Sequence, residues 1–212
     1  TPERKPFFGG TYFPPNSRYG RPGFREVLGQ LARVWKEDRQ RVEDSSRGVA
    51  EQLRSLASRA QSAVAPDHEL FASAFGPLRR SFDPKWGGFG GAPKFPRPVL
   101  LNYLLRYYAL DGNPEALEMV TQTLDGMAAG GMHDQLGGGF HRYSVDERWF
   151  VPHFEKMSYD NAGLLGNYLR AYQLTGNKFF REVSLGILVF LEDVLSNPDG
   201  GFYASQDADI NL

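Results

Sequence analysis

Apolar residues recur every three to four positions along most of the chain. Between Phe24 and about Ala60 this spacing, with charged residues in between, predicts one long amphipathic helix or two helices broken near Ser45-Ser46. The same pattern predicts further helices at about 67–82, 98–110, 113–128, 158–174 and 177–196. The segment Lys5–Pro15 differs: Gly and Pro bracket its aromatic residues, which indicates a strand that runs into a turn. We therefore expect an all-α protein preceded by one strand, whose pairing partners would precede Thr1, because no further strand pattern follows.

The helices form repeated pairs. The sequence Tyr108-Ala-Leu-Asp-Gly-Asn113 recurs as Tyr172-Gln-Leu-Thr-Gly-Asn177 after 64 residues, and each copy closes one helix and opens the next. The glycine of each copy can take the left-handed conformation that ends a helix, and the asparagine can cap the helix that follows. A tight Gly-Asn turn is therefore predicted at one end of each helix pair.

A second repeated element, Gly-Gly-Phe, marks the other end of each pair. It occurs at 87–89, 138–140 and 200–202, so the three longer loops are expected on one face of a stack of helical hairpins. Such a stack either continues as an open solenoid or closes into a toroid. The long, glycine-rich and aromatic loops at 82–96 and 130–158 favour the (α/α) toroid, since loops of this kind often form active sites.

Composition and charge exclude several classes of function. Hydrophobic residues make up 41% of the chain and aromatic residues 14%, enough to fill a core. With 24 Lys and Arg against 25 Asp and Glu, the net charge of -1 gives no field to attract nucleic acid or an anionic membrane. No run of about 18 apolar residues and no signal-peptide pattern is present, so a soluble, cytoplasmic protein is expected. The absence of cysteine excludes disulfides and thiolate chemistry from this chain.

Candidate acid and base groups gather in and after the loop at 130–158. Glu155 and Asp160 form a plausible carboxylate pair, Asp207 is a further acid on the same face, and His153 can transfer protons near neutral pH. Glycoside cleavage needs two carboxyl groups roughly 5 to 10 Å apart. The alternative is structural: Asp160 would cap the helix that starts at Ser158, and Glu155 would pair with a neighbouring Lys or Arg.

The same loops contain candidates for ligand binding. A short hairpin is predicted at 140–151, turning near Asp146-Glu147, and would hold the loop in place. The predicted ligand-binding residues are charged, aromatic or amide side chains in or next to the loops: His141, Arg142, Trp149, Tyr159, Asn161, Lys94, Phe89 and Asp209. The spacing of the histidines matches no short metal-ligand motif, so neither a metal nor another cofactor is expected.

Four segments carry a family resemblance, and together they span nearly the whole chain in order: 7–15, 87–96, 153–162 and 205–209. They resemble the spermatogenesis-associated protein twenty family of thioredoxin domain-containing proteins. The resemblance implies a thioredoxin-like domain with a Cys-rich redox motif, followed by a six-hairpin toroid similar to N-acylglucosamine 2-epimerases and six-hairpin glycosidases. On this basis 1–22 is expected to be the C-terminal remnant of the thioredoxin-like domain, 23–65 a linking helical region and 66–212 an incomplete toroid.

Two functional hypotheses follow. In the first, the toroid binds or processes a small, carbohydrate-like ligand through its loop face, as an epimerase or glycosidase does. In the second, it is a non-catalytic binding module or scaffold for a peptide or protein client, and redox chemistry belongs to the thioredoxin-like part. The sequence does not predict an oligomeric state.

Overall fold

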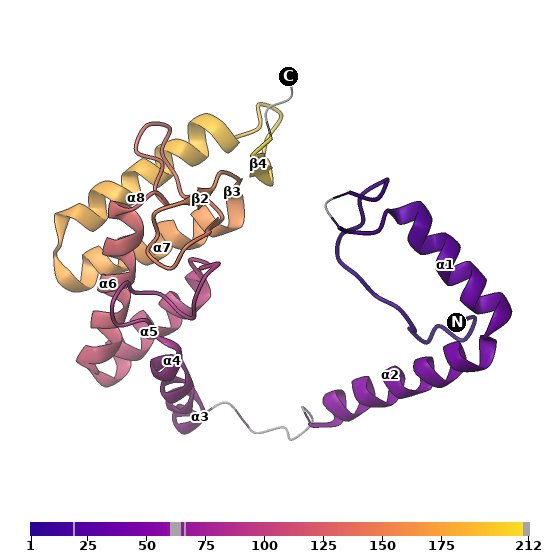
Figure 1. Cartoon of the computed structure of the whole chain (residues 1–212). Helices are drawn as coiled ribbons and strands as arrows, with labels where there is room; N and C mark the ends of the chain where they lie inside the picture. Colours follow the sequence, from indigo (N-terminus) through magenta and orange to yellow (C-terminus); the bar gives the residue numbers. More distant parts are fainter. Residues whose placement is uncertain (19, 60–64, 66, 210–212) are drawn as a thin grey trace. The chain divides into compact units, whose positions relative to one another are not determined.

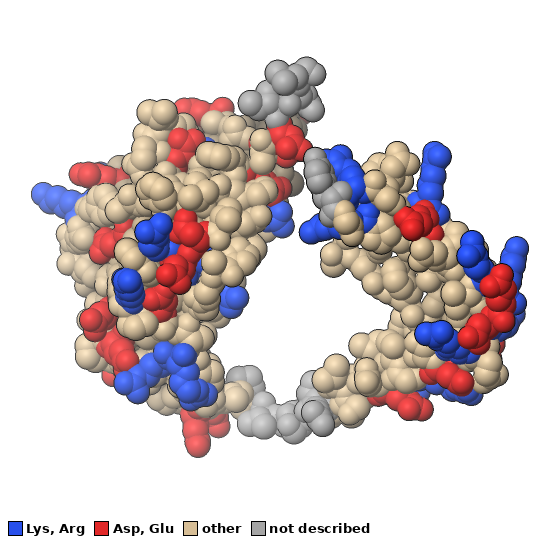
Figure 2. Space-filling model, in the orientation of Figure 1, with Lys and Arg blue, Asp and Glu red and all other residues tan. Residues whose placement is uncertain are grey.

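A computed structural model of the chain describes residues 1–18, 20–59, 65 and 67–209 (Figure 1). Its contacts separate into an N-terminal unit, Thr1–Ala65, and a helical unit, Pro66–Leu212. No helix in the described part of the chain is both long and apolar enough to cross a membrane. On the face shown in Figure 2, acidic and basic side chains are interspersed over both units.

Two helices form most of the N-terminal unit: α1 Phe24–Glu37 and α2 Arg39–Arg59. The break falls at Asp38 and not, as the sequence suggested, near Ser45-Ser46, because the Asp38 carboxylate accepts a hydrogen bond from the backbone N–H of Arg41 and so caps α2.

The strand predicted at Lys5–Pro15 is not formed. Within the described residues no second strand offers it a ladder, and its side chains pack on helices instead. Phe7 stacks on Trp35 of α1 with ring centroids 6.0 Å apart, and Phe13 contacts Phe24. The aromatic residues that indicated a strand therefore serve as packing residues.

The helical unit contains the repeated hairpins. Its helices are α3 His68–Ser73, α4 Phe75–Ser81, α5 Pro98–Asp111, α6 Pro114–Ala129, α7 Ser158–Thr175 and α8 Lys178–Phe190, which continues as the π-helical segment η1 Leu191–Leu195. The helix predicted at 67–82 is split at Ala74, because Pro77 lacks the N–H that would continue α3 into α4.

The two Gly-Asn turns have the predicted geometry. Gly112 and Gly176 have φ angles of 68° and 71°, in the left-handed region. The Asn113 side chain accepts hydrogen bonds from two backbone N–H groups of α6, and Asn177 accepts one from α8. Each turn thus ends one helix and caps the next.

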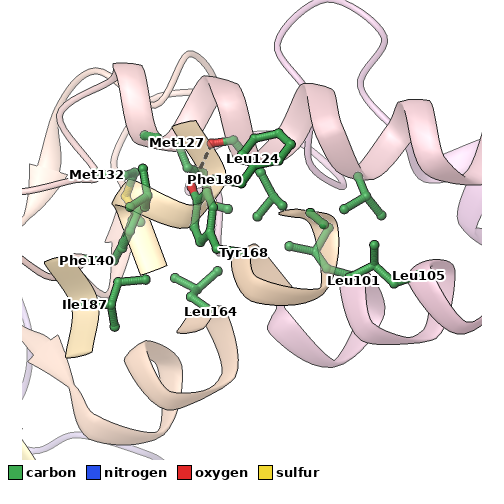
Figure 3. Close-up of a cluster of buried hydrophobic side chains, with 14 of the residues drawn as sticks. Leu101, Leu105, Leu124, Met127, Met132, Phe140, Leu164, Tyr168, Phe180 and Ile187 are labelled. Atoms are coloured by element: carbon green, nitrogen blue, oxygen red, sulfur yellow. Dashed lines mark hydrogen bonds between the residues drawn. The ribbon is translucent and has the colours of Figure 1, made fainter. Parts of the chain in front are cut away.

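The core lies between the paired helices. The helix α7 contacts α5, α6 and α8, and α5 also contacts α6. Figure 3 shows apolar side chains from all four helices meeting there, with the Tyr168 hydroxyl donating to the carbonyl oxygen of Leu124 at 2.7 Å. Burial of this cluster is the main force that holds the hairpins together.

Short strands lie at the N-terminal ends of α5 and α7 (Figure 1). The strand β1 Tyr143–Ser144 pairs with β2 Pro152–His153, and β3 Lys156–Met157 pairs with β4 Ser205–Gln206. The predicted hairpin therefore exists, but it closes at 143–153 and not at 140–151, because the Asp146 carboxylate accepts three backbone N–H groups, from Arg148 to Val151, in a wider turn.

Candidate ligand site at the loop end of the helical unit

The three Gly-Gly-Phe loops share one construction. In the first, the backbone N–H of Asp83 donates to the Gly88 carbonyl oxygen, the Asp83 carbonyl oxygen accepts from Gly87, and the Asp83 carboxylate accepts two more backbone N–H groups. Asp134 makes the same bonds in the second loop, and Asn197 makes the corresponding backbone bonds in the third. The paired glycines of each loop have positive φ, as this turn requires.

Backbone pairing links the loops to one another. Lys94, after the first loop, pairs with Ser144, after the second, and Lys156 pairs in the same way with Gln206, after the third. The prediction that the three loops share one end of the hairpins is therefore confirmed.

A buried lysine completes each of the first two loops. Lys94 Nζ lies 2.5 Å from Asp83 Oδ2 and 2.9 Å from the Gly87 carbonyl oxygen, and Lys156 Nζ lies 2.7 Å from Asp134 Oδ2. Burial alone would raise the pKa of Asp134, but the hydrogen bonds from Lys156 and from the loop backbone outweigh it and hold the pKa far below its usual value. Lys94 is 0% exposed, so the ligand-binding role predicted for it is not supported.

Three further predicted ligand residues also serve as packing. Trp149 is 0% exposed, and its indole N–H donates to the Trp86 carbonyl oxygen at 2.8 Å. Phe89 is buried edge-on against Phe82. Asn161 is fully buried; its amide oxygen accepts the N–H of Phe140, and its amide nitrogen donates to the carbonyl oxygens of Phe140 and Met157. These side chains have no polar group or surface left for a ligand.

His141 is also mostly buried. Its ring packs edge-on against Phe154, and Nδ1 has no hydrogen-bond partner in the described part of the chain. Burial, and then the nearby charge of Lys156, lower the pKa of the His141 imidazole. The ring is therefore held neutral at physiological pH.

Asp160 lies differently from these residues. It stands in the first turn of α7, is 7% exposed, and its carboxylate accepts no hydrogen bond from any described residue. It lines a cavity of about 340 Å³ between the first turns of α5 and α7, together with Pro98, Val99, Asn102, Tyr159, Gly163 and Asn167. The two helices come close here because Gly163 has no side chain: a Cβ atom would lie 2.6 Å from Pro98 Cβ.

Burial raises the pKa of Asp160 to about 6, against the opposing effect of the Arg142 charge. The capping role considered for Asp160 is wrong, since its carboxylate makes no cap hydrogen bond to α7. An acid that has no hydrogen-bond partner among the described residues, faces a cavity and has a raised pKa is suited to bind a ligand or move a proton.

Arg142 and Glu155 form an ion pair near this cavity. Arg142 Nη1 lies 2.6 Å from Glu155 Oε2, and the Arg142 backbone N–H donates to the Glu155 carbonyl oxygen. This bond raises the pKa of the guanidinium, and the Tyr159 hydroxyl adds to the effect. Glu155 therefore pairs with Arg142 and not with Arg148 or Lys156.

Asp207 belongs to the same end of the unit. Because Lys156 pairs with Gln206, Glu155 and Asp207 flank the β3–β4 ladder at one end. Asp207 is exposed, and its carboxylate accepts the backbone N–H of Asp209, which is also exposed. Both remain available to a ligand.

His153 belongs to an aromatic stack. Its ring lies 4.7 Å from that of Tyr143, which in turn lies 4.9 Å from Phe95. The pairing of Lys94 with Ser144 and of Tyr143 with His153 places the three rings side by side. Tyr143 and Phe95 were not among the predicted site residues, and only strand register could have found them.

The sequence also missed Asn102 and Asn167, two amide side chains that line the Asp160 cavity. Both residues lie on helices that the sequence predicts. The feature that could have revealed them is a polar residue on the helix face through which α5 and α7 contact each other. In the described ranges no three His, Asp or Glu residues are grouped so that they could hold a metal ion.

Solved structures define the fold of the helical unit. A sugar epimerase from a ruminal bacterium aligns with a TM-score of 0.57 and 16% identity over 63% of this chain and 37% of that one. Cellobiose 2-epimerase from Bacillus thermoamylovorans aligns with a TM-score of 0.57 and 14% identity over 66% and 40% of the two chains. A family 76 α-mannanase from Bacteroides thetaiotaomicron aligns with a TM-score of 0.51 and 15% identity over 59% of this chain and 37% of that one. The unit therefore has part of the helical-toroid fold of six-hairpin glycosidases and sugar epimerases, as predicted.

Sequence relatives identify the family. Spermatogenesis-associated protein 20 of Rattus norvegicus and of Homo sapiens are each 42% identical over 221 aligned residues, which cover 99% of this chain and 27% and 28% of those proteins. The family model Thioredox_DsbH, described as a protein of unknown function (DUF255), matches residues 1–54. The chain belongs to the spermatogenesis-associated protein 20 family, as its motifs predicted, and spans about a quarter of the length of these relatives.

Proposed function

We propose that the helical unit binds a small, carbohydrate-like ligand in the cavity between α5 and α7, and that Asp160 exchanges a proton with it. The observation that carries this proposal is the state of Asp160, which is buried, has no hydrogen-bond partner among the described residues and faces a cavity of about 340 Å³. Such a group leaves its hydrogen-bonding capacity free for a ligand that enters the cavity.

The cavity lining suits a polyhydroxylated ligand. Asn102 and Asn167 provide amide groups, and Pro98 and Val99 provide an apolar rim. The Tyr159 side chain is 60% exposed at the same place. Hydroxyl groups can bond the amides and the carboxyl group while C–H faces pack on the rim and the ring.

Asp160 can act as an acid and as a base. With a pKa near 6, both its protonated and its ionised forms are present close to neutral pH. The protonated form donates to a ligand oxygen, and the ionised form that results is stabilised by the nearby positive charge of Arg142. Glu155, held by Arg142, is the second carboxylate of the site. The sugar epimerases and mannanase that share this fold support chemistry of this kind, but do not choose between epimerisation and hydrolysis.

The test is a thermal-shift and calorimetric screen of the protein with neutral mono- and disaccharides. At about 100 times its dissociation constant a bound sugar should stabilise the protein by about 2.7 kcal/mol. Hits are then assayed for turnover with Asp160→Asn, and with Asp193→Asn on η1 as an exposed control that also removes one negative charge. We expect Asp160→Asn to abolish turnover and the control to keep it.

Two outcomes would count against the proposal. If no sugar shifts the melting temperature, the unit is not a carbohydrate site. If sugars bind but no turnover occurs, and Asp160→Asn binds as the wild type does, the unit is a non-catalytic binding module.

A further inference from the structure

A second cavity lies further along the same two helices. It has a volume of about 380 Å³ and is lined by Arg106, Ala109 and Leu110 of α5, Arg170, Gln173 and Leu174 of α7, and Phe71 of α3. On α5 the series Asn102, Arg106, Leu110 follows helical spacing, and on α7 Asn167, Arg170, Leu174 does the same. The two cavities therefore lie on one face of the α5–α7 pair.

Asn102 joins the two cavities. It lines the Asp160 cavity, and its Oδ1 atom accepts hydrogen bonds from Arg106 Nε at 3.3 Å and from Arg170 Nη1 at 3.5 Å. Arg106 thus reaches back one turn toward the N-terminal end of α5, as helical side chains do, and Arg170 reaches across from α7 to the same residue. The two guanidinium groups lie at the level of Asn102, next to the cavity that contains Asp160.

The charges of these arginines are not balanced. Within the described residues neither Arg106 nor Arg170 forms an ion pair, and both share one neutral amide oxygen at long range. Asp111, the acid at the end of α5, is bonded to His68 at 2.7 Å. The other walls of the cavity are mainly apolar, and Leu110 is 69% exposed. Two converging cations beside an apolar wall attract an anionic group.

We propose that the ligand of the α5–α7 groove is an anionic sugar, whose phosphate or carboxylate group binds Arg106 and Arg170 while its hydroxyl groups reach Asn102 and Asp160. This inference rests on the proposed function and narrows it to sugar phosphates and uronic acids. A planar guanidinium group bonds either anion through two N–H donors, so the pair can hold the charged end in one orientation. Charge attraction also predicts that binding weakens as salt increases.

Calorimetric titration of the protein tests the idea with four probes: glucose, glucose 6-phosphate, glucuronic acid and inorganic phosphate. We expect at least one anionic sugar to bind about tenfold or more tightly than glucose, because two charge-assisted contacts are added. Arg106→Gln/Arg170→Gln should remove this preference, so that the anionic sugar and glucose bind this variant with affinities that agree within about twofold. The tighter of the two anionic sugars identifies the anion.

Matched variants separate charge in the groove from charge in general. Arg80→Gln/Arg181→Gln removes the same two charges from exposed positions on α4 and α8 and should keep the preference. Arg106→Lys/Arg170→Lys keeps the charge but loses the planar donors, so this variant should keep only part of the preference for the anionic sugar. Melting temperatures within a few degrees of the wild type confirm that each variant is folded.

The results distinguish this inference from the proposed function. If glucose binds in a manner that depends on Asp160 but anionic sugars bind no more tightly, the anion site is wrong and the proposed function stands. Preference for the anion in Arg106→Gln/Arg170→Gln would overturn the inference as well. So would inorganic phosphate that binds as tightly as glucose 6-phosphate, because the sugar would then add nothing. If no sugar binds, both proposals fail.

Discussion

The ammonium group of Lys156 lies 2.7 Å from the carboxylate of Asp134, and this contact connects the loop framework to the candidate site. Lys156 follows Glu155 directly and precedes Asp160 by four residues. The second bond of Lys156, to the Gly138 carbonyl oxygen at 2.8 Å, anchors β3 to the second Gly-Gly-Phe loop. The position of both site carboxylates therefore depends on this buried pair.

Lys156→Met should destabilise the helical unit by about 1 to 3 kcal/mol, because the Asp134 carboxylate, which is 27% exposed, loses its charged partner but keeps two backbone hydrogen bonds. Denaturant unfolding of the wild type and the variant measures the change. Lys178→Met, on the exposed first turn of α8, is the control and should change stability by less than about 0.5 kcal/mol. A loss below about 1 kcal/mol for Lys156→Met would show that the pair does not hold the loop.

Gly88 and Gly90 offer a matched test of the Trp149 packing. Both have positive φ, 81° and 77°, so alanine is strained at either position by about 1 to 2 kcal/mol. A Cβ atom at Gly88 would lie 2.4 Å from Trp149 Cζ2, whereas one at Gly90 meets nothing within 4 Å. We expect Gly88→Ala to cost about 1 to 3 kcal/mol more than Gly90→Ala in denaturant unfolding. Equal losses would mean that Trp149 can move aside without penalty.

The sequence predicted the features that a short stretch of backbone determines. Gly112 and Gly176 end helices and Asn113 and Asn177 cap them because of conformations and hydrogen bonds that involve only neighbouring residues. The paired glycines of the loops likewise mark a local turn. For this reason the repeated hairpins, and the common end of their loops, could be read from spacing.

The roles of the loop side chains could not be predicted in the same way. Lys94 and Trp149 have the residue types of a ligand site, but their partners stand 11 and 63 residues away in the sequence. Only the fold shows that both are buried. Asp160 was recognised as a candidate, and its alternative role as a cap could be excluded only once its hydrogen bonds were known.

Asp160 should make the protein less stable as the pH rises through the range from about 4 to 6. Burial raises its pKa in the folded state from 3.8 to about 6, so the folded protein binds this proton more tightly than the unfolded chain. One pKa unit corresponds to about 1.4 kcal/mol, so the loss is at most about 3 kcal/mol. Asp160→Asn, which cannot ionise, should not show this loss of stability.

The measurement is the difference in unfolding free energy between Asp160→Asn and the wild type at several pH values. The difference should move in favour of the variant between pH 4 and pH 7. Asp193→Asn, at an exposed position, should show no such trend. A constant difference for Asp160→Asn would mean that the carboxyl group is solvated in the folded protein and that its pKa is not raised.

His141 should have the opposite effect on stability. Burial lowers the pKa of its imidazole below 6.5 in the folded state, so the unfolded chain takes up the proton first and stability is lost as the pH falls below about 6.5. His141→Phe keeps a ring against Phe154 but cannot be protonated, so it should lose less stability than the wild type between pH 7 and pH 5. His68→Gln, at an exposed position on α3, should not reduce the loss.

Because Asp160 and His141 act with opposite sign, the double variant Asp160→Asn/His141→Phe should have a flatter stability profile across this range than either single variant. A profile for His141→Phe that parallels the wild type would show that water or a partner already solvates the ring nitrogen in the folded protein.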